Sequence, residues 1–432
     1  MKFKKYFTTK HITKGFFIAI CLSTFIYIEH FKLLDGYFLY FFNSIISLVG
    51  LYYLLKSPTP VWFFTGFFIG VLWFWWMGVS FYYYNLAYLI PIAIVIIGLI
   101  MGLIFLFSAY LASFIAKKIE QRFPSILYED TIVFLRAFAL LIPITFELFG
   151  FNWFKLQVNF IDSFFGVEFW QFVLIVFTLA MFIEFKKWYI LLILFFALDF
   201  NKPLIFTPKS LQDIELLSTN INTKDKWKRE NQKQYTSFAL KSIDNAIKKG
   251  KKLIIFPESF LPYFLNLETP YLNEFLKRSK DITIIIGSLY YKGNNNFRNS
   301  AYIIQNGKYK IANKVVLVPF GEANPLPEFM SKIVNKIFFD GAVDYKADNN
   351  FTYIHALDKK YKIAICYEGT SKKTYEDNPE YLIVLSNDAW FYPSTEPTLQ
   401  MLLMKYFAKL YNTTIYHSIN KAPSYIIMPF EE

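Results

Sequence analysis

The chain has 432 residues and a net charge of +12, and 55% of its residues are hydrophobic. A soluble domain cannot cover that much apolar surface, so the composition excludes an ordinary soluble protein and indicates a membrane protein. The positive charge does not indicate a nucleic-acid partner, because much of it lies between apolar segments and the rest is spread along the second half. Attraction to an anionic lipid surface explains the charge better.

The apolar residues concentrate in residues 1–200, which we predict to form a transmembrane domain of about seven helices. Most of the apolar stretches are close to the ~20 residues that cross a bilayer as a helix. They cover residues 12–28, 37–55, 61–81, 86–116, 131–150, 167–185 and 188–200. The last stretch is short, so six spans are the alternative, but Lys186-Lys187 separates it from the sixth as the charged turn of a hairpin would. A cleaved signal peptide is the alternative for the first stretch, although no small-residue cleavage site follows it.

Lysine and arginine predict the orientation of these helices. Threading seven helices places the basic N-terminus, Lys56, Lys117-Lys118 and Lys186-Lys187 on one side. Cytoplasmic loops hold the positive charge of a membrane protein. We therefore expect residues 201–432 on the opposite, extracytoplasmic face.

The membrane half contains a pair of charged residues and an aromatic stretch, each of which suggests a position within the membrane. Arg136 and Glu147 are eleven positions apart, on nearly the same face of the fifth stretch. Such charges face the bundle interior, either near an active-site mouth or, as we favour, in a structural pair. The aromatic stretch 73–84 contains three tryptophans and is typical of an interfacial belt, with a role in lipid access as the alternative.

Residues 201–432 show a different pattern, which predicts an α/β domain. Short apolar runs indicate buried strands. They cover residues 214–219, 253–256, 282–286, 301–304, 361–365, 381–385, 414–419 and 425–428. Helical spacing is evident over 235–247, before Gly250, and over 399–410, after Ser394 or Thr395 as the N-cap.

Cysteine and histidine usage narrows the chemistry. Cys21 lies in the first predicted membrane helix, so Cys366 has no disulfide partner in the extracytoplasmic part. A lone thiol in an oxidising compartment is more often used than incidental. The histidines show no ligand spacing, so we predict no metal and no cofactor; they are His11, His30, His355 and His417.

Three residues supply the groups that an acyl-enzyme needs. Cys366 closes the apolar run 361–366, and Glu258 follows Pro257 at the predicted carboxyl end of a strand, where α/β sheets build their sites. With Lys314 these residues form a sulfur nucleophile, a proton acceptor and a cation. Taken singly, each has an ordinary alternative: an inert buried thiol, a helix N-terminal carboxylate and a solvated lysine.

Together, four motifs resemble the nitrilase (carbon–nitrogen hydrolase) superfamily and, within it, the bacterial apolipoprotein N-acyltransferase family. They are Pro257-Glu258-Ser259, Leu317-Val-Pro-Phe-Gly-Glu322, Cys366-Tyr-Glu368 and Asn387-Asp-Ala-Trp-Phe391. The resemblance spans nearly the whole chain, including the membrane half and Glu147-Leu-Phe-Gly150 in the fifth stretch. It implies a polytopic α-helical membrane domain followed by an αββα sandwich.

The resemblance also implies roles for individual residues. Glu258 would be the base, Lys314 would stabilise the tetrahedral intermediate, and Cys366 would be the nucleophile. The supporting residues would be Glu322 and Glu368, whose alternative is a place in ordinary turns. Candidate substrate-binding or shielding residues are Trp390, Phe260, Tyr263 and the apolar segment 325–339, with core packing as the alternative for the last three.

The implied substrates are both anchored to lipid. A phospholipid would donate an acyl chain to Cys366, and the amine of a diacylglyceryl-cysteine at a lipoprotein N-terminus would accept it, at the periplasmic face of the bacterial inner membrane. A membrane-tethered amidase or hydrolase with the same triad is the alternative enzyme. A lipid-binding or transport protein with an inactive nitrilase scaffold is the alternative outside enzymes, but the intact triad and the lack of matched broken helices argue against it.

The end of the chain departs from the family pattern. Lys421-Ala-Pro423 stands where the family commonly has a glycine-containing turn, and no long apolar stretch follows before Glu432. We therefore expect no eighth membrane helix.

Overall fold

The computed structural model describes residues 8–83, 85–145, 150–206, 212–319, 321–322 and 345–430. They divide into two compact units. The helical unit comprises Met1–Leu148, Asn152–Lys202 and Ser394–Tyr406, and the sandwich unit comprises Phe149–Phe151, Pro203–Pro393 and Phe407–Glu432. The main change from one unit to the other therefore occurs at Lys202, and part of one late helix belongs with the helical unit.

The helical unit consists of apolar helices joined by short connections. Its α-helices are α1 (Thr9–Cys21), α2 (Thr24–Phe31), α3 (Gly36–Leu55), α4 (Thr59–Phe74), α5 (Ile90–Arg122), α6 (Tyr128–Ala139), α7 (Leu141–Thr145) and α8 (Phe169–Phe185). Tighter 3₁₀ segments are η2 (Trp75–Tyr82), η3 (Ala87–Leu89), η4 (Leu156–Phe160) and η5 (Trp188–Ala197).

The observed helices follow the predicted stretches but differ in length and continuity. Within the described residues, three helices are long and apolar enough to cross a membrane, or four if the α1–α2 pair, bent by 48°, is one span. The bend falls where Thr24 Oγ1 donates a hydrogen bond to Ile20 O at 2.6 Å, which competes with the helical hydrogen-bond ladder. The sixth and seventh stretches form α8 and η5, which are shorter than a full span. Seven spans stay a prediction.

The aromatic stretch after α4 packs partly inside the unit. Trp73 and Trp76 are buried, and the indole N–H of Trp73 donates to Ser23 Oγ at 3.0 Å. These two tryptophans therefore do not form the lipid-facing belt that the sequence predicts. Arg136 is also buried and donates to Leu55 O at 3.2 Å, whereas Glu147 lies outside the described residues.

Among its described residues, the sandwich unit contains two sheets of six strands each. The first has the order β1-β12-β11-β10-β9-β8, and the second has the order β2-β3-β5-β6-β7 with β4 beside β5. The bounds are β1 (Leu204–Phe206), β2 (Ile214–Leu216), β3 (Leu253–Ile255), β4 (Leu261–Phe264), β5 (Thr283–Tyr291), β6 (Phe297–Gln305), β7 (Lys308–Asn313), β8 (Tyr353–Ala356), β9 (Lys359–Ile365), β10 (Tyr381–Asn387), β11 (Thr414–Asn420) and β12 (Tyr425–Met428). The neighbouring strands β9-β10-β11 of the first sheet and β2-β3-β5 of the second are parallel.

Alternating side chains join these sheets into layers. Leu253, Ile255 and Ile285 point into a core that they share with Ile363 and Ile383 of the other sheet. The intervening residues of the second sheet instead pack against helices. Because successive strand residues face opposite sides, one continuous apolar run serves two cores.

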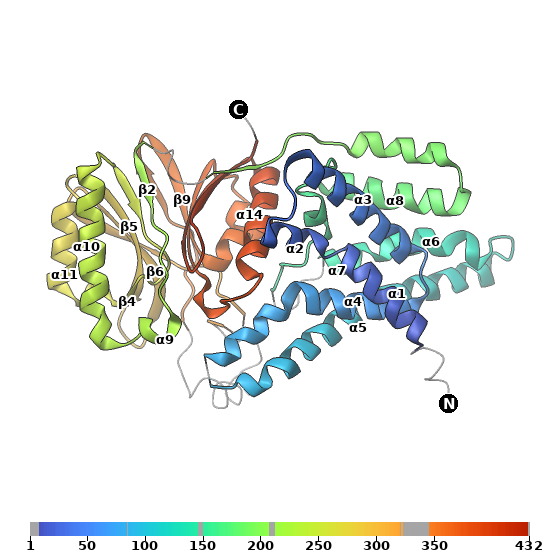
Figure 1. Ribbon diagram of the computed structural model, residues 1–432, viewed down its shortest axis with the longest axis horizontal. Helices are drawn as coiled ribbons and strands as arrows, with labels where there is room; N and C mark the ends of the chain where they lie inside the picture. Colours follow the sequence, from blue (N-terminus) through green and yellow to red (C-terminus); the bar gives the residue numbers. More distant parts are fainter. Residues whose placement is uncertain are drawn as a thin grey trace. The chain divides into compact units, whose positions relative to one another are not determined.

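Helices cover the outer faces of the sandwich. Helices α10 (Gln232–Lys248) and α11 (Thr269–Arg278) lie on the sheet of β5 and β6 (Figure 1). On the other side, α13 (Lys372–Tyr375) contacts the end of α14 (Glu396–Tyr411), where Tyr375 stacks on Phe407 with ring centroids 5.0 Å apart. The predicted αββα sandwich is confirmed.

Candidate active site

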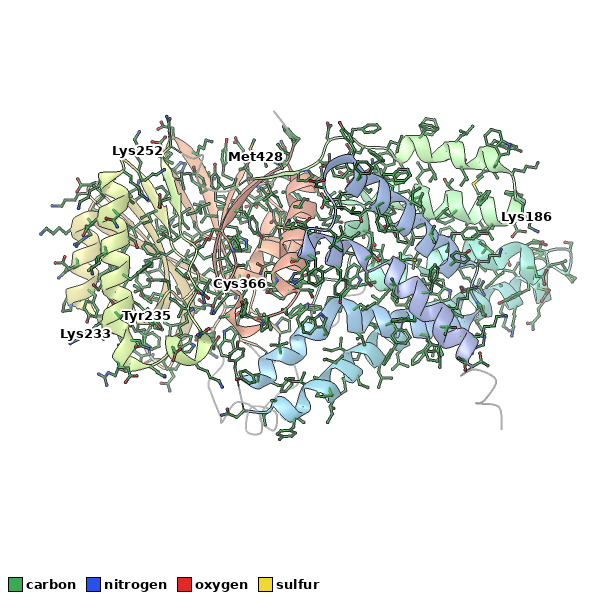
Figure 2. The ribbon with its side chains drawn as sticks, viewed as in Figure 1. Lys186, Lys233, Tyr235, Lys252, Cys366 and Met428 are labelled. Atoms are coloured by element: carbon green, nitrogen blue, oxygen red, sulfur yellow. The ribbon has the colours of Figure 1, made fainter. Side chains whose placement is uncertain are left out.

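Cys366 lies directly after β9, at the carboxyl end of a parallel strand (Figure 2). It starts the short 3₁₀ turn η9 (Cys366–Thr370), and its φ is +55°, in the left-handed region that non-glycine residues rarely adopt. Such a conformation costs on the order of 1–3 kcal/mol and clusters at functional sites. The side chain is half-buried. The thiol is therefore presented at a sharp strand-to-turn corner.

Glu258 also follows a strand, β3, and is 7% exposed. The loop that carries it runs very close to β5 at Gly287. A Cβ atom there would lie 2.4 Å from Pro257 O and 2.7 Å from the Cα of Glu258. Only glycine allows this approach, which fixes the position of the Glu258 main chain.

Lys314 follows β7, is 1% exposed and lies between two carboxylates. Its Nζ is 2.7 Å from Glu322 Oε2 and 3.5 Å from Glu258 Oε1. Burial alone would lower the pKa of Lys314, but the charges of Glu322, Glu258 and Cys366 outweigh burial and raise it. Lys314 is therefore a fixed cation close to the thiol.

Asn299, on β6, holds the two carboxylates in place. Its Nδ2 donates to Glu258 Oε1 at 2.7 Å and to Glu322 Oε1 at 2.8 Å. Glu322 Oε2 also accepts a hydrogen bond from the main-chain N–H of Val318. One amide group thus sets the distance between both glutamates and leaves Lys314 between them.

Glu368 supports the site through the main chain. Its carboxylate accepts hydrogen bonds from the N–H groups of Val315 at 2.6 Å, Val316 at 2.9 Å and Ile365 at 2.7 Å. Burial raises the pKa of Glu368 to about 7, while Lys314 and these N–H groups favour its ionised form. The carboxylate ties the end of β9 to the segment after Lys314, which positions the thiol relative to the cation.

The candidate substrate-binding residues occupy different surroundings. Trp390 is half-buried in the turn η10 (Asp388–Trp390) after β10. Phe260 is 1% exposed and packs on Phe256, and the Tyr263 hydroxyl is 2.6 Å from Thr236 Oγ1 of α10. These contacts belong to the core between sheet and helices, so they favour packing over substrate contact for Phe260 and Tyr263. Residues 325–339 lie outside the described residues.

Asp388 is a buried acid that the sequence did not single out. It is 1% exposed, and neither of its carboxyl oxygens has a hydrogen-bond partner among the residues that the structure describes. Burial and the nearby charge of Glu258 raise the pKa of Asp388 well above its ordinary value. Burial therefore favours the protonated form of Asp388.

The sequence analysis also did not predict Asn299 and Lys226 as site residues. Asn299 stands inside a strand with no motif around it, and Lys226 stands in the charged run Lys224-Asp-Lys-Trp-Lys228, which is typical of a solvated surface. Within the described part of the chain, no cluster of histidine, cysteine and acidic residues could hold a metal ion.

Comparisons with known proteins cover both parts of the chain. Residues 9–201 match the apolipoprotein N-acyltransferase integral membrane domain, and residues 219–410 match the carbon-nitrogen hydrolase family. The apolipoprotein N-acyltransferase of Wolinella succinogenes is 37% identical over 431 residues, covering 98% of this chain and 97% of that protein. Those of Helicobacter hepaticus and Campylobacter jejuni are each 34% identical and cover 89% and 97% of this chain, and 94% and 90% of their own lengths. The resemblance predicted from the four motifs is confirmed.

Proposed function

This chain belongs to the apolipoprotein N-acyltransferase family, and from that premise we propose that it transfers an acyl chain from a phospholipid to the N-terminal amine of a diacylglyceryl-cysteine on lipoproteins. The chain is a multi-pass membrane protein with an acyltransferase's catalytic domain. In the proposed reaction Cys366 is the nucleophile, Glu258 is the base and Lys314 stabilises the negative charge.

One observation carries the proposal. Lys314 is almost completely buried, lies within 3.5 Å of Glu258 and within 2.7 Å of Glu322, and interacts electrostatically with Cys366. Burying these charges together is costly, because desolvation opposes each of them. Such a costly cluster indicates a functional site. Converging acid, cation and thiol at strand ends is the arrangement that acyl transfer needs.

Acylation of the enzyme is the first step. Glu258 accepts the proton of the Cys366 thiol, and Sγ attacks the ester carbonyl carbon of the phospholipid. The carbonyl oxygen becomes an oxyanion, which the ammonium group of Lys314 stabilises. The carbon–oxygen bond to the glycerol then breaks, Glu258 returns the proton to the leaving oxygen, and a lysophospholipid departs from the thioester.

Transfer of the acyl chain is the second step. The neutral amine of the lipoprotein cysteine attacks the thioester carbonyl carbon, and Lys314 again stabilises the oxyanion. The carbon–sulfur bond breaks, and Glu258 accepts a proton from the nitrogen and returns it to the Cys366 sulfur. The product is an amide, and the enzyme is back in its starting protonation state.

Intact-mass analysis tests this function. The purified protein in detergent is incubated with a phospholipid of known acyl chains, and the modified residue is located by peptide mapping. We expect one acyl adduct on Cys366, which persists until a peptide with an N-terminal diacylglyceryl-cysteine is added and then moves to that peptide. Cys366→Ala serves as the control and should remain unmodified.

Two outcomes would contradict the proposal. Absence of an adduct on Cys366 would exclude the thioester route. Loss of the adduct as free fatty acid without any acceptor would favour the membrane-tethered hydrolase instead.

We also propose that the enzyme lies in the bacterial inner membrane with its sandwich unit on the periplasmic face. Support comes from the lysines of the predicted cytoplasmic loops, such as Lys186, and from the lack of similar clusters between the alternate helices. Single cysteines replacing Lys186 or the exposed Lys252, in a Cys21→Ala/Cys366→Ala background, can be labelled in spheroplasts with a membrane-impermeant maleimide. We expect labelling at position 252 and none at position 186; the reverse pattern would overturn the orientation.

A further inference from the structure

A second lysine, Lys226, is buried close to Glu258. It ends the short helix α9 (Thr223–Lys226) and is 1% exposed. Its Nζ donates a hydrogen bond to the main-chain oxygen of Glu258 at 3.1 Å. Burial lowers the pKa of Lys226 to about 8, and the charges of Glu258 and Cys366 oppose that shift. Near neutral pH the ammonium form therefore predominates.

Lys226 differs from Lys314 in what surrounds its charge. Lys314 makes ion pairs with two carboxylates. In the described ranges, no carboxylate lies within ion-pair distance of Lys226, and its hydrogen bond goes to a neutral carbonyl oxygen. A buried cation with only a neutral acceptor is costly. The charge of Lys226 is attracted by Glu258 and, once the thiol has lost its proton, by Cys366.

A hydrogen-bond network positions the segment before α9. The side chain of Asn420, at the end of β11, accepts from Ile221 N and donates to Ile221 O, both at 2.8 Å. Its Nδ2 also donates to Asn387 Oδ1 at 2.8 Å, at the end of β10. The segment that leads to Lys226 is thus tied to the same strand ends that carry the site, so the burial of Lys226 is part of the framework.

We propose that Lys226 is a second cation of the active site, a positioning residue that holds the main chain of Glu258 and favours the ionised form of the Cys366 thiol. This inference rests on the proposed function, in which the thiolate is the attacking group. Lys226 stays protonated throughout, since the thiol proton passes to Glu258.

The effect of Lys226 on the thiol depends on the other charged groups around both residues. Glu258 and Cys366 are the ionised or ionisable groups that face it, Lys314 shares both neighbours, and the protonated Asp388 lies by Glu258. Lys314 makes ion pairs with Glu322 and Glu258, whereas the hydrogen bond of Lys226 goes to a neutral oxygen. The charge of Lys226 therefore adds to that of Lys314 at an ionising Cys366.

The pH dependence of thiol alkylation tests the inference. Full-length protein in detergent is treated with iodoacetamide over a range of pH, and alkylation of Cys366 is followed by peptide mass analysis. Lys226→Met removes both the charge and the hydrogen bond. Lys226→Gln keeps a donor for the Glu258 carbonyl but lacks the charge, and Lys226→Arg keeps the charge. Lys228→Met is the matched control, because Lys228 is an exposed lysine two positions away.

We expect Lys226→Met and Lys226→Gln to alkylate about tenfold more slowly than wild type near neutral pH and to reach the same limiting rate at high pH, since removing one nearby charge shifts a pKa by about one unit or more. Lys226→Arg and Lys228→Met should keep the wild-type profile.

A wild-type profile for Lys226→Gln would overturn the inference, as would an equal shift for Lys226→Arg. Should Lys226→Met not fold, the glutamine and arginine variants decide the question, because both retain a donor for the carbonyl group. A wild-type protein that forms no acyl adduct would refute the proposed function alone, since the alkylation profiles measure the thiol without a phospholipid.

Discussion

The two units of this protein bury charged groups in different ways. In the helical unit, the buried charges of Arg136, Lys405 and Asp162 are held by separate pairwise contacts. Arg136 donates to the end of α3 at Leu55 O, and Lys405 pairs with Asp162. The Asp162 main-chain oxygen in turn accepts from Asn43. These contacts connect neighbouring helices and suit a structural purpose.

In the sandwich unit the buried charges converge instead. Lys314, Glu258 and Glu322 form one cluster, and Glu368 and Lys226 join it through main-chain hydrogen bonds. The cluster stands at strand ends, and one of its neighbours is a thiol in a left-handed conformation. The comparison shows that a buried charge does not by itself identify a functional site. A functional site is indicated when several buried charges converge on one reactive atom.

The largest expected effect is at Cys366, the atom on which the sandwich charges converge. Cys366→Ala should abolish acyl-enzyme formation and turnover, because no other described thiol faces the cluster. Cys366→Ser should lose activity with little change in unfolding temperature, since the volume is nearly kept. Intact-mass analysis and a transfer assay measure both. Wild-type transfer by the alanine variant would show that Cys366 is not the nucleophile.

Loss of the central cation, Lys314, should have the next largest effect. Lys314→Met should slow acylation by about 10²–10³-fold, the effect of losing one oxyanion donor. It should also destabilise the protein, because the buried Glu258 and Glu322 lose their ion-pair partner. Glu258→Gln should prevent acylation, because the base is lost. Single-turnover mass analysis measures these rates, and normal acylation by Lys314→Met would refute its oxyanion role.

A helical-unit charge should affect stability and not chemistry. Lys405→Met leaves Asp162 buried without its cation, and we expect a loss of about 3–5 kcal/mol in the free energy of unfolding. Adding Asp162→Asn should recover most of this loss, because both charges are then removed. Thermal unfolding in detergent measures the effect. A fall in the acylation rate of the folded Lys405→Met protein would contradict this prediction, because a charge of the helical unit would then affect the reaction.

Glu368 should have a moderate effect, since it acts through the main chain. In Glu368→Gln an amide N–H replaces one of the oxygens that accept hydrogen bonds, so at least one buried N–H loses its acceptor, at about 1–3 kcal/mol. We expect acylation that is slower than in wild type but faster than in Lys314→Met. Complete loss of acylation in a folded Glu368→Gln protein would give this residue a direct part in the reaction.

The sequence predicted the central strands of the sandwich better than its edges. The runs that became β3, β5, β9 and β10 are rich in isoleucine and buried on both faces, which makes them visible as continuous apolar segments. The edge strands β1, β7 and β8 were missed, as was the short strand β4. Half of β7 is exposed, as its sequence Lys308-Tyr-Lys-Ile-Ala-Asn313 suggests, so it lacks an apolar run.

The site residues, too, were only partly predictable from the sequence. The motifs around Glu258, Lys314 and Cys366 were recognisable in the sequence, and the structure brings these residues together. Lys226 was not recognisable, because its burial depends on the long-range hydrogen bonds of Asn420 with Ile221 and Asn387. In the helical unit, hydropathy located the helices but not the bend after α1, which depends on local side-chain bonding at Thr24.

The smallest expected effect is at Asp388, a buried acid without a counter-charge. The unfolded carboxyl ionises above its ordinary pKa of about 3.9, while folded Asp388 keeps its proton, so this residue makes the folded state lose stability as pH rises, by about 1.4 kcal/mol per pH unit. Asp388→Asn removes this dependence. The buried amide carries a desolvation cost of its own, which leaves an expected net gain of about 1–2 kcal/mol near neutral pH.

The comparison of wild type with Asp388→Asn by thermal unfolding at several pH values measures this gain. The pH-dependent part of the difference should vanish below pH ~3, where both the folded and the unfolded Asp388 are protonated, and should grow toward neutral pH. A difference that is constant with pH would mean that folded Asp388 is ionised. Asp388 would then be a further buried carboxylate beside Glu258, which would raise the demand on Lys226 as the second cation.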